Sequence, residues 1–173
     1  RDALVSIADV LATLFYVAGL GLTRDPYVMV SLDNMWINAG RQQFHLPTRP
    51  KGQVLGGRIG LVMPDLDALT ARLKAVEQKL AGTTFAWATE NGHVAVTCPW
   101  GTRFRCHAPG PPWGERVLGI PYVEFLVAPG TASGIGRFYT EVLGAPSTLT
   151  QEGSGAVARV GVGCWQSLIF RET

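Results

Sequence analysis

The same order of expected elements occurs three times along the chain, and this repetition constrains the fold more than any single motif does. In each unit a short apolar strand precedes an amphipathic helix, and further strands follow. The apolar spacing predicts the three helices at residues 10–20, 66–81 and 135–142. A unit of roughly 55–60 residues that mixes a helix with several strands predicts the α+β class.

Two stretches of sequence recur between the units. The sequence FYVAGLGL at 15–22 matches FYTEVLGA at 138–145, in a helix and in the glycine that ends it. The sequence DALVSIAD at 2–9 matches RIGLVMPD at 58–65, and the aspartate at the end of each is expected to cap a helix. The units are therefore expected to be copies of one strand–helix–strand motif.

Composition excludes several classes of protein. Of the 173 residues, 47% are hydrophobic and 16% are charged, as in a compact globular protein. The net charge of +2 is too small to predict binding to nucleic acid or to an anionic membrane. No apolar run reaches the ~18 residues that a membrane span needs. Three cysteines without a C-x-x-C motif predict reduced thiols, and hence a cytoplasmic protein, rather than a disulfide framework.

A hairpin expected at residues 92–107 carries a candidate functional surface. Its turn is the Pro-Trp-Gly tripeptide at 99–101. The second strand alternates between apolar and polar residues, so that one face carries Arg103, Arg105 and His107. This face therefore presents three basic or ligand-capable side chains.

Glu124 is the one acidic residue in an otherwise apolar strand expected at 122–127. A buried carboxylate needs a partner, because burial disfavours its charged form. Glu124 is therefore either a site residue or the partner of an arginine such as Arg159.

Proline and glycine are concentrated at residues 109–114, which is the strongest linker signal in the chain. This linker divides the chain into residues 1–112, with two complete units, and residues 113–173, with a third unit that needs a partner unit. That partner is expected beyond Thr173 or in another chain, so a homodimer is the expected assembly.

The order of these motifs resembles the vicinal oxygen chelate superfamily, which includes glyoxalase I, extradiol dioxygenases, and fosfomycin- and bleomycin-resistance proteins. The matching features are Phe-Tyr and then Leu-Gly-Leu in the first unit, the strand-Pro-Asp-Leu opening of the second, and the Pro-x-Gly-x-x-Phe hairpin that closes it. The resemblance implies paired βαβββ units that form a curved, incompletely closed mixed sheet around a cavity.

The resemblance also implies a set of metal ligands. In metal-dependent members, four side chains from the first and last strands of two units bind a divalent ion. The equivalent side chains here are Asp2, His45, Arg58 and Arg105. Gln43 and His107 lie on the same expected faces and are the alternative ligands. A guanidinium has no free lone pair and stays protonated, so the two arginines disfavour a metal.

Each candidate residue has two interpretations. His45 is a metal ligand or catalytic base, or else a histidine satisfied by a neighbour inside the sheet. Arg58 and Arg105 form an anion clamp for a carboxylate or phosphate, or else Arg58 pairs with Asp2 and Arg105 is half-solvated. The third unit adds further candidate ligand-binding residues: Tyr122 and Glu124 on its first strand, and Gln166, Leu168 or Phe170 on its last.

The leading hypothesis is therefore a glyoxalase- or dioxygenase-like protein that binds a small anionic molecule in the sheet cavity, with its metal site degraded. Whether it also transforms that molecule stays open. The first alternative is a divalent-metal-dependent lyase, isomerase or dioxygenase. The second is a non-catalytic sequestration or assembly protein, because a shared fold does not fix the chemistry.

Overall fold

The computed structural model describes residues 7–28, 34–47, 49 and 51–173. The first unit begins with the helix α1 (Ile7–Ala12), which continues as the π-helix η1 (Thr13–Gly19). Three antiparallel strands follow in the order β1 (Thr23–Arg24), β2 (Asn34–Ala39) and β3 (Gln42–Pro47), and they form a sheet of their own. The helix expected at 10–20 is thus present, but its second half is π-helical.

The second and third units are both complete βαβββ motifs, as the resemblance implies. The second unit consists of β4 (Gly57–Val62), α2 (Leu66–Glu77), the 3-10 turn η2 (Gln78–Leu80), β5 (Ala86–Glu90), β6 (His93–Thr97) and β7 (Arg103–His107). The third consists of β8 (Tyr122–Val127), α3 (Ala132–Glu141), β9 (Ser147–Glu152), β10 (Gly155–Gly161) and β11 (Ser167–Glu172). Between them lies the short turn η3 (Pro111–Trp113).

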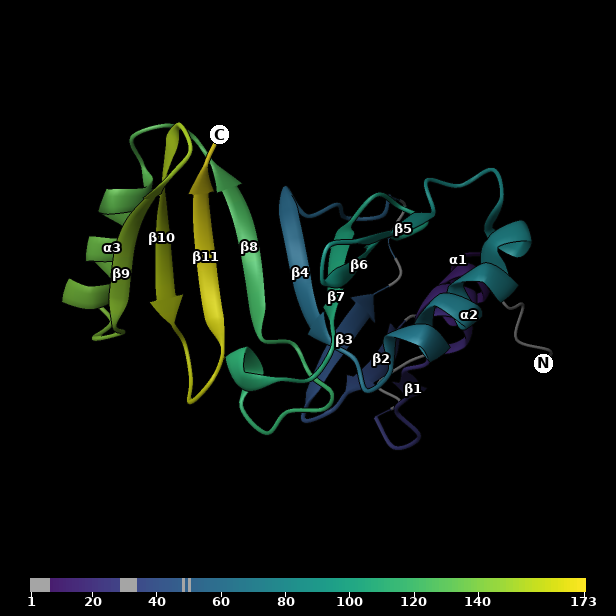
Figure 1. Cartoon of the computed structure of the whole chain (residues 1–173). Coiled ribbons are helices and arrows are strands. Elements are labelled where there is room, and N and C mark those ends of the chain that lie inside the picture. Colours follow the sequence, from purple (N-terminus) through teal and green to yellow (C-terminus); the bar gives the residue numbers. More distant parts are fainter. Residues whose placement is uncertain (1–6, 29–33, 48, 50) are drawn as a thin grey trace.

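These two units form one eight-stranded mixed sheet with the order β5-β6-β7-β4-β8-β11-β10-β9 (Figure 1). Within each unit the first and last strands are parallel, and the units meet where β4 runs antiparallel to β8. The sheet does not close into a barrel, and α2 and α3 lie towards its opposite ends (Figure 1). The expected α+β class with paired units is confirmed.

The third unit pairs with a different partner from the one that the sequence predicts. We expected the third unit to need a unit beyond Thr173 or in another chain, but β8 pairs with β4 of the second unit. The sheet therefore crosses the boundary expected between residues 1–112 and 113–173. The predicted first strand and the predicted strand at 28–32 fall largely outside the described residues.

Two glycines of β4 allow the close approach of β8 at this seam. A Cβ atom on Gly57 would lie 1.8 Å from the carbonyl oxygen of Glu124. A Cβ atom on Gly60 would lie 2.4 Å from Cε1 of Tyr122, so the phenol ring occupies the space over Gly60. Glycine in a strand commonly marks such a close approach.

The two helices pack on one side of the eight-stranded sheet, here called the helix face. Asp65 caps α2 by accepting hydrogen bonds from the amides of Asp67 and Ala68 at 2.9 Å, as the sequence predicts. One core cluster joins α2 to the first unit through buried residues that include Phe15, Phe104 and Leu73. Within the described part of the chain, no helix is both long and apolar enough to cross a membrane.

Candidate functional site

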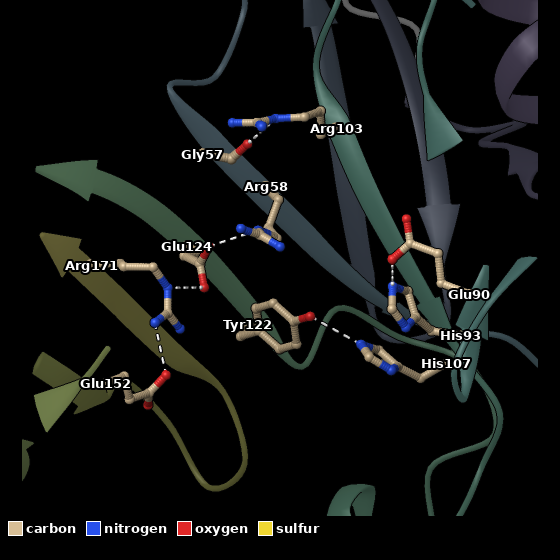
Figure 2. Close-up of polar contacts among 10 residues, drawn as sticks. All are labelled: Gly57, Arg58, Glu90, His93, Arg103, His107, Tyr122, Glu124, Glu152 and Arg171. Carbon is tan, nitrogen blue, oxygen red and sulfur yellow. Dashed lines mark hydrogen bonds and ion pairs between the residues drawn. The ribbon is translucent and has the colours of Figure 1, made fainter. Parts of the chain in front are cut away.

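The opposite side of the eight-stranded sheet, here called the polar face, collects charged and aromatic side chains around the β4–β8 seam. Side chains alternate along each strand, and paired residues of neighbouring strands point to the same side. Through the pairs that β4 and β8 make, the polar face includes Arg58, Arg105, His107, Tyr122, Glu124 and Arg171. Figure 2 shows five of these side chains, all but Arg105, gathered at the seam.

Glu124 lies between two arginines from different strands. Its side chain is only 4% exposed, and its Oε1 atom lies 2.7 Å from Nε of Arg58. Its other oxygen accepts a hydrogen bond of 3.2 Å from Nε of Arg171. The Arg58 contact is close but lacks hydrogen-bond alignment, so charge rather than hydrogen bonding holds that pair. The partners of Glu124 are therefore Arg58 and Arg171, and not Arg159 as the sequence suggested.

A fourth residue extends this network to the edge of the sheet. Arg171 also donates a hydrogen bond of 2.7 Å from its terminal nitrogen to Glu152 (Figure 2). This bond lowers the pKa of Glu152 and raises that of Arg171. The four charges thus neutralise one another pairwise.

A second group on the polar face consists of His107 and Tyr122. Nε2 of His107 lies 2.9 Å from the hydroxyl of Tyr122 (Figure 2). Burial, with the nearby His93 and Arg105, lowers the pKa of His107 to about 4, and burial raises the pKa of Tyr122. At neutral pH the imidazole and the phenol are therefore both uncharged, and the tautomer of His107 determines which of the two donates the hydrogen bond.

Two further side chains enclose the pair. The ring of Trp113 lies 4.7 Å from that of His107 and 6.1 Å from that of Tyr122. His93 lies 5.7 Å from His107 and contacts Glu90 at 2.9 Å. The Trp113 indole belongs to the turn that the sequence marked only as a linker.

His45 lies apart from this group, on the separate three-stranded sheet. Its ring stacks on Trp36 at 4.2 Å, and its Nε2 atom lies 2.9 Å from Oδ1 of Asn34. Gln43 of the same strand donates hydrogen bonds of 2.7 Å to Asp25 and to Asn38. Asp2 lies outside the described residues. The structure therefore does not bring His45 together with Arg58 and Arg105.

The sequence did not identify Arg171 as a site residue. The expected site position on the last strand is Gln166, Leu168 or Phe170, but Ile169 pairs with Glu124 and Arg171 with Leu126. The register on β11 is thus shifted by one residue, which exchanges the two faces. Arg171 is the one basic residue of this strand, and a search for the partner of a buried glutamate would have found it.

Among the described residues, the polar face offers few side chains that could ligate a divalent metal ion. Across the described part of the chain, no group of three or more His, Cys, Asp or Glu side chains is arranged to hold a metal. At the seam, the strands that supply ligands in metal-dependent members carry arginines and a glutamate held by two of them. A guanidinium cannot ligate a cation, and an engaged carboxylate is a poor ligand.

Comparison with solved structures finds proteins of similar architecture. Glyoxalase I from Zea mays is 17% identical, with a TM-score of 0.60 over 95% of this chain and 63% of that one. Its V278E variant is 15% identical, with a TM-score of 0.62 over 96% and 63%. A proposed dioxygenase from Bacillus subtilis is 14% identical, with a TM-score of 0.60 over 93% and 59%.

The chain thus spans about three fifths of the length of these proteins. At such low identity the likeness concerns the fold alone. No protein-family model and no curated protein sequence matches the chain.

Proposed function

We propose that this chain, whose fold is that of the vicinal oxygen chelate superfamily, binds a small anionic molecule on the polar face without a resident divalent metal. The observation that carries this proposal is the engagement of Glu124 by both Arg58 and Arg171. Its carboxylate balances these arginines instead of a metal ion. A binding function on this face then depends on positive charge that no carboxylate neutralises.

The polar face has such an excess of positive charge. Within the described residues it carries five arginines and three glutamates: Arg58, Arg103, Arg105, Arg159, Arg171, Glu90, Glu124 and Glu152. Arg105 is half-buried and makes no ion pair with a described residue. Its planar guanidinium suits a carboxylate or a phosphate. Arg105 is therefore the expected anchor of the anion, beside His107 and Tyr122.

Calorimetric titration with inorganic phosphate and with pyruvate tests this proposal. Saturable binding of at least one anion is expected, and Arg105→Gln should weaken it about tenfold or more, since a hydrogen bond to a charged group contributes about 1.5–3 kcal/mol. Arg41→Gln, at an exposed position between β2 and β3 of the separate sheet, is the matched control and should leave binding unchanged. Equal affinity in the wild type and Arg105→Gln would exclude Arg105 as the anchor.

Elemental analysis tests the second half of the proposal. Protein purified without chelator or tag metal should contain no stoichiometric nickel, zinc, manganese or iron, and reconstitution should not introduce any. One tightly held ion per chain would instead support the alternative of a divalent-metal-dependent lyase, isomerase or dioxygenase.

A second candidate function is proton transfer on the bound anion, and the His107–Tyr122 pair favours it. A neutral imidazole can accept a proton from a C–H bond next to a carbonyl, and a nearby guanidinium can stabilise the enolate that results. Exchange of the methyl protons of pyruvate in D2O, followed by NMR, measures this step. Exchange that is lost in His107→Gln supports an enzyme, whereas binding without exchange supports sequestration.

We also propose a homodimer formed through α3. This helix and the two residues that follow it expose Phe138, Val142 and Leu143, with 51%, 66% and 59% of each residue accessible. Arg137 and Glu141 lie one turn apart on the same helix. An antiparallel pair of α3 helices would place each Arg137 near the Glu141 of the other copy, which makes the surface self-complementary.

The location proposed for the protein is the cytoplasm. Cys98 and Cys106 are buried free thiols, and Cys164 is an exposed one. An exposed thiol persists in a reducing compartment.

A further inference from the structure

A cavity of ≈ 710 Å³ lies on the other side of the eight-stranded sheet from the polar face. Ile59 and Val123, which pair across the seam, line its wall, and they are the sequence neighbours of Arg58 and Glu124. Because adjacent residues of a strand point to opposite faces, this cavity is separate from the site proposed above. The first unit closes it from the other side with Met35 of β2.

The volume and the lining of this cavity are those of a small-molecule site. Pockets that hold small ligands typically measure about 300–1,000 Å³ and are mostly apolar with a few placed polar groups. The apolar wall includes Met35, Phe44, Ile59, Trp100 and Val123. Aromatic and branched side chains on this wall favour a ligand with an aromatic ring or a branched chain.

Tyr16 supplies a buried polar group in this wall. It lies in the π-helix η1, a type of helix turn that is frequent at functional sites, and it is 6% exposed. Burial and the nearby Cys98 raise the pKa of this phenol, so it stays protonated and can donate a hydrogen bond. A phenol hydroxyl in the wall of a cavity can donate a hydrogen bond to water or to a ligand oxygen.

The charged residues that line the cavity have a basic excess. They are Asp9, Arg49 and Lys51. Lys51 is exposed and belongs to the segment that joins β3 to β4. An ammonium group beside an apolar wall favours a ligand that carries a negative charge.

We infer that this cavity is a second binding site, which takes a small aromatic or branched-chain carboxylate. Its apolar part packs against the wall formed by Phe44, Ile59 and Val123. An oxygen of the ligand accepts the hydrogen bond of the Tyr16 hydroxyl, and Lys51 attracts its charge. The inference does not depend on the function proposed for the polar face.

Titration with benzoate, with benzyl alcohol as the neutral analogue, tests the inference. We expect benzoate to bind saturably, and Tyr16→Phe to weaken it about five- to tenfold through loss of one hydrogen bond. Tyr27→Phe is the matched control, because Tyr27 is 90% exposed and does not line the cavity. Lys51→Gln should weaken the binding of benzoate but not that of benzyl alcohol, and Lys79→Gln should change the binding of neither.

An NMR measurement on the wild-type chain does not depend on whether a variant folds. Benzoate should shift the indole N–H signal of Trp100, which lines the cavity, and leave that of Trp165, which lies under Arg116, unchanged. The same shift should persist in Arg105→Gln, which separates this cavity from the anion site of the polar face. No shift of Trp100, equal affinity in Tyr16→Phe, or binding of benzyl alcohol alone would overturn the inference.

Discussion

Arg58 and Glu124 lie directly opposite each other across the seam between the two βαβββ units, with 2.7 Å between Nε and Oε1. Glu124 is 3% exposed, and the charge of Arg171 on the neighbouring strand lies on its other side. One carboxylate thus joins β4 of the second unit to β8 and β11 of the third. Arg58, which stands at one of the positions where the resemblance implies a metal ligand, thus joins the two units through Glu124.

Replacement of Glu124 by glutamine should destabilise the fold. The change leaves Arg58 and Arg171 without their shared counter-charge in a partly buried setting. Loss of one partner of a buried ion pair costs about 3–5 kcal/mol. Both arginine side chains are about a quarter exposed, so we expect about 2–3 kcal/mol. Chemical denaturation measures this loss, and Glu77→Gln, at an exposed position of α2, is the control. A change below about 0.5 kcal/mol would mean that the network does not stabilise the seam.

Replacement of Gly60 by alanine should displace the ring of Tyr122. The added Cβ atom would lie 2.4 Å from Cε1 of that ring, so the ring must move and its hydrogen bond to His107 must lengthen or break. Overpacking of this kind costs about 1–3 kcal/mol. Thermal unfolding measures the effect. Gly56→Ala, one residue before β4 begins, is the matched control, since nothing lies within 4 Å of a Cβ atom there.

Protonation of His107 should destabilise the protein as the pH falls. Its pKa is about 4 in the folded chain and 6.5 in the unfolded one, so the unfolded chain binds more protons between these values. The titration of His107 therefore leaves the free energy of unfolding unchanged above pH 6.5 and lowers it from pH 6.5 towards pH 4. Since His107 is only half-buried, we expect a loss of about 1–2 kcal/mol after allowance for solvent screening. His107→Gln should flatten this part of the stability curve, and an unchanged slope in that variant would contradict the assignment.

A charge on the outer side of α3 should separate the proposed dimer. Phe138→Asp places a carboxylate in the exposed apolar patch and should convert a dimer into a monomer in sedimentation analysis. Val117→Asp is the control, because Val117 is 60% exposed and lies outside α3. A monomeric wild type, or a Phe138→Asp variant that stays dimeric, would rule out this interface.

The sequence alone determined the elements and the class of the fold. Apolar periodicity placed α2, and the capping aspartate marked its first turn, because these signals act between residues close in the chain. The alternation of β7 correctly placed Arg105 and His107 on one face and Phe104 and Cys106 on the other. The isolated acid in β8 correctly indicated that Glu124 needs a positively charged partner.

Only the tertiary structure decided which units pair and which residues meet. Pairing of β4 with β8 rather than with the first unit depends on contacts between distant segments, such as Gly57 against the backbone of Glu124. The same pairing separates His45 from Arg58 and brings Arg171 to Glu124. A shift of one residue in the register of β11 would place Arg171 on the opposite face. Local patterns fix the period of a strand but not its neighbour. The meeting of these side chains at the β4–β8 seam and the cavity behind the seam are therefore visible only in the folded chain.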